Sequence, residues 1–86
     1  MSFDAFVDAV DEHVRSRTSA EYGIYRGPHV AFWQQGDISA RVRAGMNDDV
    51  EVVIAGPQAH SVVEPCTAEA SLRIAETIAA AWNATP

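Results

Sequence analysis

Lysine is absent from this chain, and cysteine occurs only once. A single cysteine excludes an intramolecular disulfide, and the usual Cys/His spacings of zinc sites are missing. No apolar run approaches the ~20 residues that cross a bilayer, and the acidic residues among positions 1–20 are atypical of a signal peptide. We therefore expect a cytoplasmic protein that does not bind a membrane and that needs neither a metal nor a cofactor.

Positive charge is scarce, because six arginines stand against twelve aspartates and glutamates and the net charge is −6. Nucleic-acid binding depends mainly on neutralising phosphates, so this balance argues against direct binding of nucleic acid. Arginine as the sole basic residue, together with many alanines and valines, is typical of a GC-rich genome, bacterial or phage. Arginine also suits protein interfaces better than lysine, so its position in the fold decides between the two explanations.

The remaining composition indicates one small folded domain over residues 1–86. An apolar share of 48% is ordinary for a globular chain. A chain of 86 residues has no room for a second hydrophobic core.

Helical periodicity predicts a helix over residues 3–18 and another over residues 68–84. Ser2 and Thr67 are the expected N-caps. The apolar side of the first helix consists of Phe3, Phe6, Val7, Val10 and Val14. The apolar side of the second consists of Leu72, Ala75, Ile78, Ala79 and Trp82.

Between these helices the apolar residues alternate with a period of two. The alternation predicts strands over residues 21–26, 29–34, 38–44 and 50–55, with residues 61–64 as a candidate fifth strand. The strands are separated by short turns, Gly27-Pro28, Gly36-Asp37 and residues 45–49, which implies an antiparallel meander. The predicted fold class is therefore α+β, with helices packed on a sheet in two layers.

The third and fourth strands define an inner and an outer face of the sheet. Pairing Ala44 with Val50 places Val42 opposite Val52 and Ala40 opposite Ile54, all on the inner face. The same register sets Arg43 opposite Glu51 on the outer face, together with Arg41 and Val53.

The face of the aromatic residues in the second strand depends on the length of the turn that follows. A two-residue Gly36-Asp37 turn, of type II′ because of its leading glycine, directs Trp33 to the core and Phe32 outward. A three-residue turn exchanges the two residues. We favour the two-residue turns, and a two-residue Gly27-Pro28 turn then places Tyr25 on the outer face beside Val30.

The outer face is the candidate partner-binding surface, because aromatic residues and arginine are enriched at the centres of protein interfaces. Two simpler interpretations remain: one helix on each side of the sheet would bury this face, or it would be ordinary solvated surface. The candidate partner-binding residues are Tyr25, Phe32, Trp33, Arg41, Arg43 and Val53.

No residue pattern indicates catalysis or a metal site. Motifs such as G-x-S-x-G, H-E-x-x-H, the P-loop and G-x-G-x-x-G are absent, so we expect no catalytic residues and no enzymatic activity. Cys66 precedes the second helix, whose dipole could lower the thiol pKa, but it has no basic sequence neighbour and we expect an inert thiol. Asp8, Asp11, Glu12 and His13 are better explained as a solvated helix face than as metal ligands.

The sequence therefore favours a small acidic interaction module that binds a protein partner, or a second copy of itself, through the outer face of its sheet. One alternative is an acidic inhibitor, or nucleic-acid mimic, that occupies the basic groove of a larger protein through the first helix. Another is a structural subunit of a larger assembly, such as a phage particle.

Overall fold

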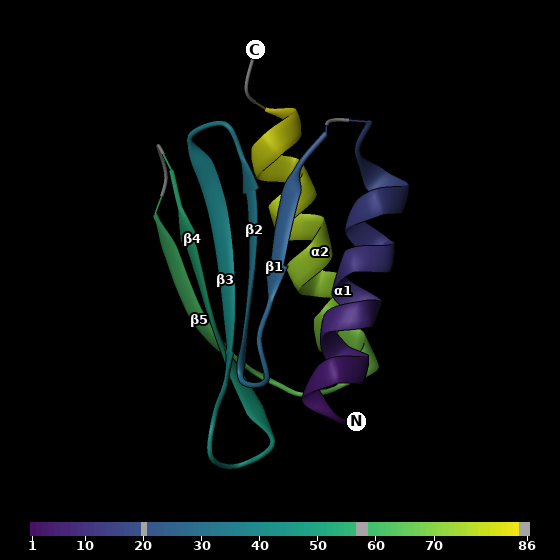
Figure 1. Ribbon diagram of the computed structural model, residues 1–86, viewed down its shortest axis with the longest axis vertical. Coiled ribbons are helices and arrows are strands. Elements are labelled where there is room, and N and C mark those ends of the chain that lie inside the picture. The colour runs from purple at the N-terminus through teal and green to yellow at the C-terminus, as the bar shows by residue number, and fades with distance from the viewer. Residues whose placement is uncertain (20, 57–58, 85–86) are drawn as a thin grey trace.

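The computed structural model describes residues 1–19, 21–56 and 59–84, which form two helices and one five-stranded antiparallel sheet. Both helices lie on the same side of the sheet, so the molecule has two layers (Figure 1). The strands follow one another in chain order, β1-β2-β3-β4-β5. In chain order, the elements are α1 (Phe3–Arg17), β1 (Gly23–Arg26), β2 (Val30–Gln35), β3 (Ile38–Ala44), β4 (Asp49–Ala55), β5 (His60–Pro65) and α2 (Ala68–Asn83).

The predicted α+β fold is confirmed, including the fifth strand. Both N-caps are also confirmed, because the Ser2 hydroxyl accepts the Ala5 N–H at 3.1 Å and the Thr67 hydroxyl accepts the Ala70 N–H at 3.2 Å. Most predicted boundaries lie within one residue of the observed ones, whereas β1 begins two residues later than expected.

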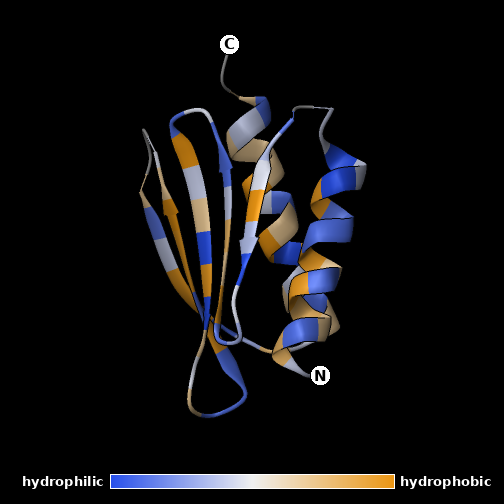
Figure 2. Ribbon diagram, viewed as in Figure 1, coloured by the Kyte–Doolittle hydropathy of each residue, from blue (hydrophilic) through white to orange (hydrophobic). Residues whose placement is uncertain are grey.

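The predicted apolar side of α2 needs one correction. Ile74 is buried, although it was not among the expected residues, whereas Leu72 is only partly buried. The buried stripe of α2 is wide because this helix packs against both α1 and the sheet. Figure 2 shows hydrophobic residues distributed more widely along α2 than along α1, which is hydrophilic over most of its visible surface.

The two-residue turn between β2 and β3 is confirmed, since Gln35 pairs with Ile38. Gly36 has a φ of 59°, while the only described non-glycine residue with positive φ is Asp48. Positive φ at the first turn position alone is the type II′ pattern. Trp33 consequently lies opposite Ala40 on the inner face, where it is completely buried.

The turn between β1 and β2 differs from the prediction. Its two turn residues are Pro28 and His29, because the Gly27 N–H donates to the Val30 carbonyl at 2.8 Å. Proline at the first position suits such a turn because its φ is already fixed. The pairing therefore slides by two residues and places Tyr25 opposite Phe32 instead of Val30. A slide of two residues preserves the faces, so Tyr25 still points outward.

Asp11 connects α1 to the sheet through a cluster of hydrogen bonds. Its carboxylate accepts from Arg15 Nη2 at 2.8 Å, from the Tyr22 hydroxyl at 2.8 Å and from Trp33 Nε1 at 3.1 Å. Burial by itself raises the pKa of Asp11, but these hydrogen bonds outweigh it and leave the pKa below the ordinary 3.8. Burial and the bond to Asp11 together raise the pKa of Tyr22 to about 12.

We expect Asp11→Ala to lower the free energy of unfolding by about 2–3 kcal/mol, because it leaves the buried Trp33 indole N–H without its acceptor. Asp11→Asn retains a side-chain carbonyl as an acceptor and should cost about 1 kcal/mol. Urea denaturation at neutral pH measures both values. Equal losses in the two variants would contradict a specific role for the acceptor oxygen.

The difference in stability between wild type and Asp11→Asn should also depend on pH. Because the folded pKa of Asp11 is lowered, its ionised form contributes stability above the ordinary value of 3.8. That contribution is lost as the pH falls through the folded pKa, so the two proteins should become similar in stability in acid. A difference that persists unchanged at the lowest pH where both still fold would contradict the assignment.

Candidate functional site

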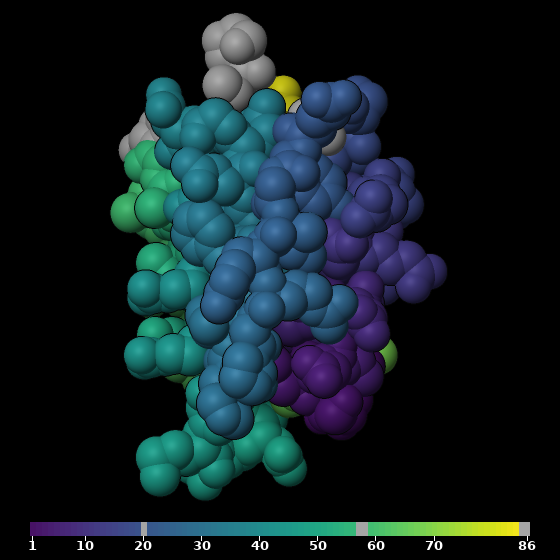
Figure 3. Space-filling model, in the orientation of Figure 1, coloured from purple at the N-terminus to yellow at the C-terminus, as the bar shows by residue number. Residues whose placement is uncertain are grey.

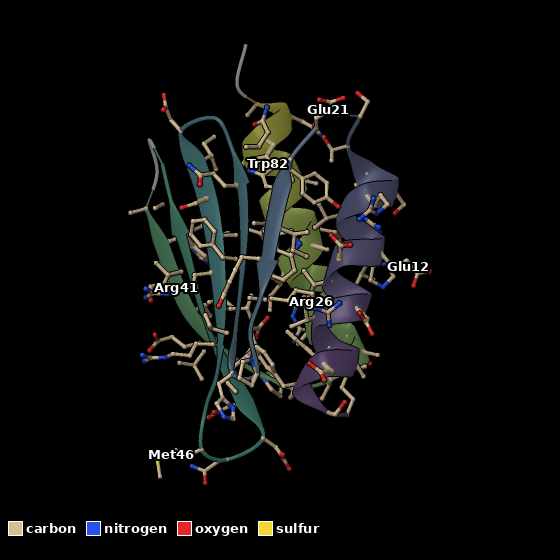
Figure 4. The ribbon with its side chains drawn as sticks, in the orientation of Figure 1. Glu12, Glu21, Arg26, Arg41, Met46 and Trp82 are labelled. Carbon is tan, nitrogen blue, oxygen red and sulfur yellow. The ribbon has the colours of Figure 1, made fainter. Side chains whose placement is uncertain are left out.

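The outer face of the sheet is not covered by either helix. Tyr25 pairs with Phe32, Phe32 with Arg41, and Arg41 with Val53, so these four residues form one row across β1 to β4. We call it the aromatic–arginine row. In the space-filling view, side chains of β1 to β3 lie in front and α1 lies to their right (Figure 3). Arg41 projects away from the helices (Figure 4).

The exposed fractions along this row show a surface accessible to a partner. Tyr25 is 63% exposed, Arg41 is exposed, and Phe32 and Val53 are half-buried between their neighbours. None of the four belongs to the core. Tyr25, Phe32, Arg41 and Val53 therefore lie on one accessible face, as their strand parity predicts.

Arg43 lies on the same face, one pair of residues along the strand, but its charge is partly engaged. Its Nη2 is 3.1 Å from Glu51 Oε1, the residue directly opposite on β4. Val30 and Val63 extend this second row on either side, and Val63 is 62% exposed.

Arg41 differs from the other arginines because its guanidinium makes no hydrogen bond or ion pair with residues 1–19, 21–56 and 59–84. Each of the other five has at least one acceptor: Arg15 contacts Asp11, Arg17 the His13 carbonyl, Arg26 Asp8, Arg43 Glu51 and Arg73 Glu64. A guanidinium presents five donors in a planar fork that matches a carboxylate. Arg41 therefore offers an unused fork at the centre of the aromatic–arginine row.

Trp33 was a candidate partner-binding residue only for the alternative three-residue turn, and the structure has the favoured two-residue turn. Trp33 points to the helix side of the sheet, is 0% exposed and donates its indole N–H to Asp11. The type II′ turn at Gly36 sets the register that directs Trp33 inward and Phe32 outward.

Cys66 lies beside the N-terminus of the chain, next to Met1. It is 8% exposed, and its thiol donates to the Met1 carbonyl at 3.3 Å. Burial raises the pKa of the Cys66 thiol, and Asp48 raises it further, while the Met1 ammonium lowers it less than burial raises it. The pKa of Cys66 is therefore raised and not lowered, contrary to what a helix dipole acting alone would give.

Three of the four acidic residues of α1 lie beside an arginine, although the side chains of Asp4 and Asp8 remain largely exposed. Asp8 forms an ion pair with Arg26, and Asp4 Oδ1 is 4.0 Å from the same guanidinium. Figure 4 shows Arg26 directed toward α1 and Glu12 directed away from the sheet. Over the described part of the chain, no three His, Cys, Asp or Glu side chains gather closely enough to hold a metal ion. In the same residues, neither helix is both long and apolar enough to cross a membrane.

A hollow of about 150 Å³ lies between β5 and α2, and the sequence pattern did not reveal it. Its floor is apolar and consists of Val52, Ile54, Val62 and Ile74. Ligand pockets usually enclose at least ~300 Å³, so this hollow is small for a metabolite. The alternation of apolar residues around Val62 predicts a strand, but it does not predict which part of α2 packs beside that strand.

No protein-family model, curated protein or solved structure matches this chain. The proposed function therefore depends on the geometry of the outer face.

We expect Arg41→Ala to change the free energy of unfolding by less than about 0.5 kcal/mol, because Arg41 has no acceptor among the described residues. Arg26→Ala is the matched comparison and should cost about 1 kcal/mol, since it removes the contact with Asp8 that joins β1 to α1. Urea denaturation measures both. A loss of more than about 1 kcal/mol for Arg41→Ala would show an internal role for this side chain.

We expect the Cys66 thiol to react at least ~10-fold more slowly with a disulfide reagent in the native protein than in the urea-unfolded chain at the same pH. The physical reasons are its burial and its raised pKa. Stopped-flow absorbance of the released thiolate measures the rate. Equal rates in the two states would contradict the description of Cys66 as an inert thiol.

Proposed function

We propose that this protein is a non-enzymatic, cytoplasmic interaction module that binds a protein partner through the outer face of its sheet. The observation that supports the proposal is the exposed position of Arg41 and the lack of an acceptor for it among the described residues. Its guanidinium has no acceptor among the described residues, it lies between Phe32 and Val53, and the face that carries it is open.

The chemistry of the face indicates the kind of surface that fits it. Tyr25 and Phe32 offer apolar rings that lose little conformational entropy on binding, and such residues dominate interface energetics. Arg41 can bind a carboxylate with two parallel hydrogen bonds. A fitting partner therefore presents an aspartate or glutamate beside apolar side chains.

The size of the face indicates reversible binding. Strands lie ~4.8 Å apart and six residues span ~20 Å, so five strands offer roughly 500 Å². An interface of this size buries about 1,000 Å² in total, which is the low end for specific complexes. We therefore propose a transient complex, with most of the affinity near the aromatic–arginine row.

The alternative of an acidic inhibitor has less support. It needs free carboxylates on α1, but Asp4 and Asp8 lie beside Arg26, and Asp11 is bonded to Arg15, Tyr22 and Trp33. The alternative of a structural subunit in a larger assembly would be favoured by self-assembly of the isolated protein.

The test compares partner capture by wild type, Arg41→Glu, Phe32→Glu and the control Arg17→Glu. Arg17 is exposed at the end of α1, so its variant has the same charge change as Arg41→Glu without altering the outer face. We expect proteins captured by wild type and Arg17→Glu to be lost, by at least ~10-fold, with both outer-face variants. Circular dichroism confirms that each variant is folded.

Light scattering on the same four proteins measures their mass and shows whether the partner is a second copy of the chain or a different protein. Self-association that disappears in Arg41→Glu and Phe32→Glu would mean that the outer face binds another copy. Equal capture and equal mass for all four folded proteins would refute the proposed function.

A further inference from the structure

The second surface of interest is the free edge of β5. This strand is last in the sheet and pairs only with β4 among the described strands. In Figure 1 it forms the side of the sheet farthest from α1. An edge strand presents backbone N–H and C=O groups without sheet partners, which makes it a template for another strand.

The pairing with β4 determines which backbone groups of β5 face outward. The Cys66 N–H donates to the Asp48 carbonyl at 2.8 Å, so residue 66 directs its backbone groups toward β4. Because these directions alternate along an antiparallel strand, Glu64, Val62 and His60 also bond toward β4. Ser61 and Val63 then direct their N–H and C=O groups to the free edge. Pro65 shares that direction, where its missing N–H removes no bond to β4.

The opposite edge of the sheet is less available. β1 has only four residues, and its Arg26 side chain forms an ion pair with Asp8 of α1. A short edge strand is a common protection against edge pairing. Charge does not distinguish the two edges, because Glu64 of β5 is likewise paired with Arg73 of α2. β5 has six residues, and Val63 is 62% exposed.

We propose that a second copy of this chain pairs with β5 in antiparallel fashion, around a two-fold axis at Val62, to form one continuous sheet. Ser61 then lies opposite Val63 of the partner subunit, and the two residues exchange both N–H···O bonds. The two-fold axis repeats this exchange on its other side. Val62 lies opposite Val62 of the partner subunit, next to the apolar hollow between β5 and α2.

Charge complementarity supports this register. It places His60 opposite Glu64 of the partner subunit, and an imidazole N–H can donate to a carboxylate in either protonation state. Arg73 Nε holds Glu64 in place at 3.0 Å, on the helix side of the sheet that His60 also faces. The two neighbouring registers lose the pairing of His60 with Glu64 of the partner subunit. Sliding by two residues in one direction also places Pro65, which has no N–H, opposite Ser61. Sliding in the other direction places His60 opposite Val62.

The pairing through β5 does not require the outer face to bind a partner. If both occur, the pairing adds a second outer face to the complex. Both helix layers would lie on one side of the joined sheet, so both outer faces would remain open on the other side. Two outer faces held in a fixed arrangement could bind a partner with two sites more tightly than a single face, through effective concentration.

Sedimentation equilibrium over a series of concentrations tests the pairing with His60→Glu, His60→Arg and the control His29→Glu. His29 is exposed in the turn before β2, so its variant has the same charge change away from β5. We expect wild type to dimerise reversibly and His60→Glu to weaken the dimer by about 10-fold or more, since like charges then lie opposite one another. His60→Arg and His29→Glu should dimerise at least as strongly as wild type.

Val63→Pro tests the backbone bonds separately. It removes an N–H that faces the free edge and leaves the bonds to β4 in place, so the variant should remain folded by circular dichroism and be monomeric. A wild type that is monomeric at all concentrations would overturn the pairing, as would dimers of equal strength in all the His60 variants. Arg41→Glu should dimerise like wild type, so failure of the edge pairing is distinguishable from failure of the outer-face proposal.

Discussion

The register set by the Gly36-Asp37 turn is the constraint on which the rest of the structure depends. With two turn residues, Trp33 faces the helices and Phe32 faces outward beside Arg41. One more residue in this turn would exchange the faces of β2, exposing the large indole and placing Phe32 in its position. The core and the candidate binding surface are thus two consequences of one backbone geometry.

The core lies on one side of the sheet, and a polar cluster fixes how α1 sits on it. Asp11 accepts hydrogen bonds from Tyr22 and Trp33, and Arg26 reaches from β1 to Asp8. Asp11 and Asp8 are therefore part of the contact between the helix and the sheet.

The outer face and the β5 edge are separate surfaces with different chemistry. The outer face offers side chains, and its affinity would come from aromatic rings and from the guanidinium of Arg41, which has no acceptor among the described residues. The β5 edge offers backbone groups, and its specificity would come from the placement of His60 and Glu64 along the strand. Because side chains stand perpendicular to a sheet while its hydrogen bonds lie within it, the two surfaces can be occupied together.

The sequence by itself determined the elements, their order, the N-caps and the pairing of β3 with β4, because these follow from local periodicity and short turns. Turn chemistry also favoured the correct faces for Trp33 and Phe32, although it placed the first turn at Gly27-Pro28 when the structure has Pro28-His29. Only the tertiary structure decided that both helices cover one face, that Ile74 joins the core and that Arg41 has no acceptor among the described residues. Local sequence patterns show which side of each helix or strand is apolar. The side of the sheet that a helix covers depends instead on the path of the chain that connects the helix to the sheet.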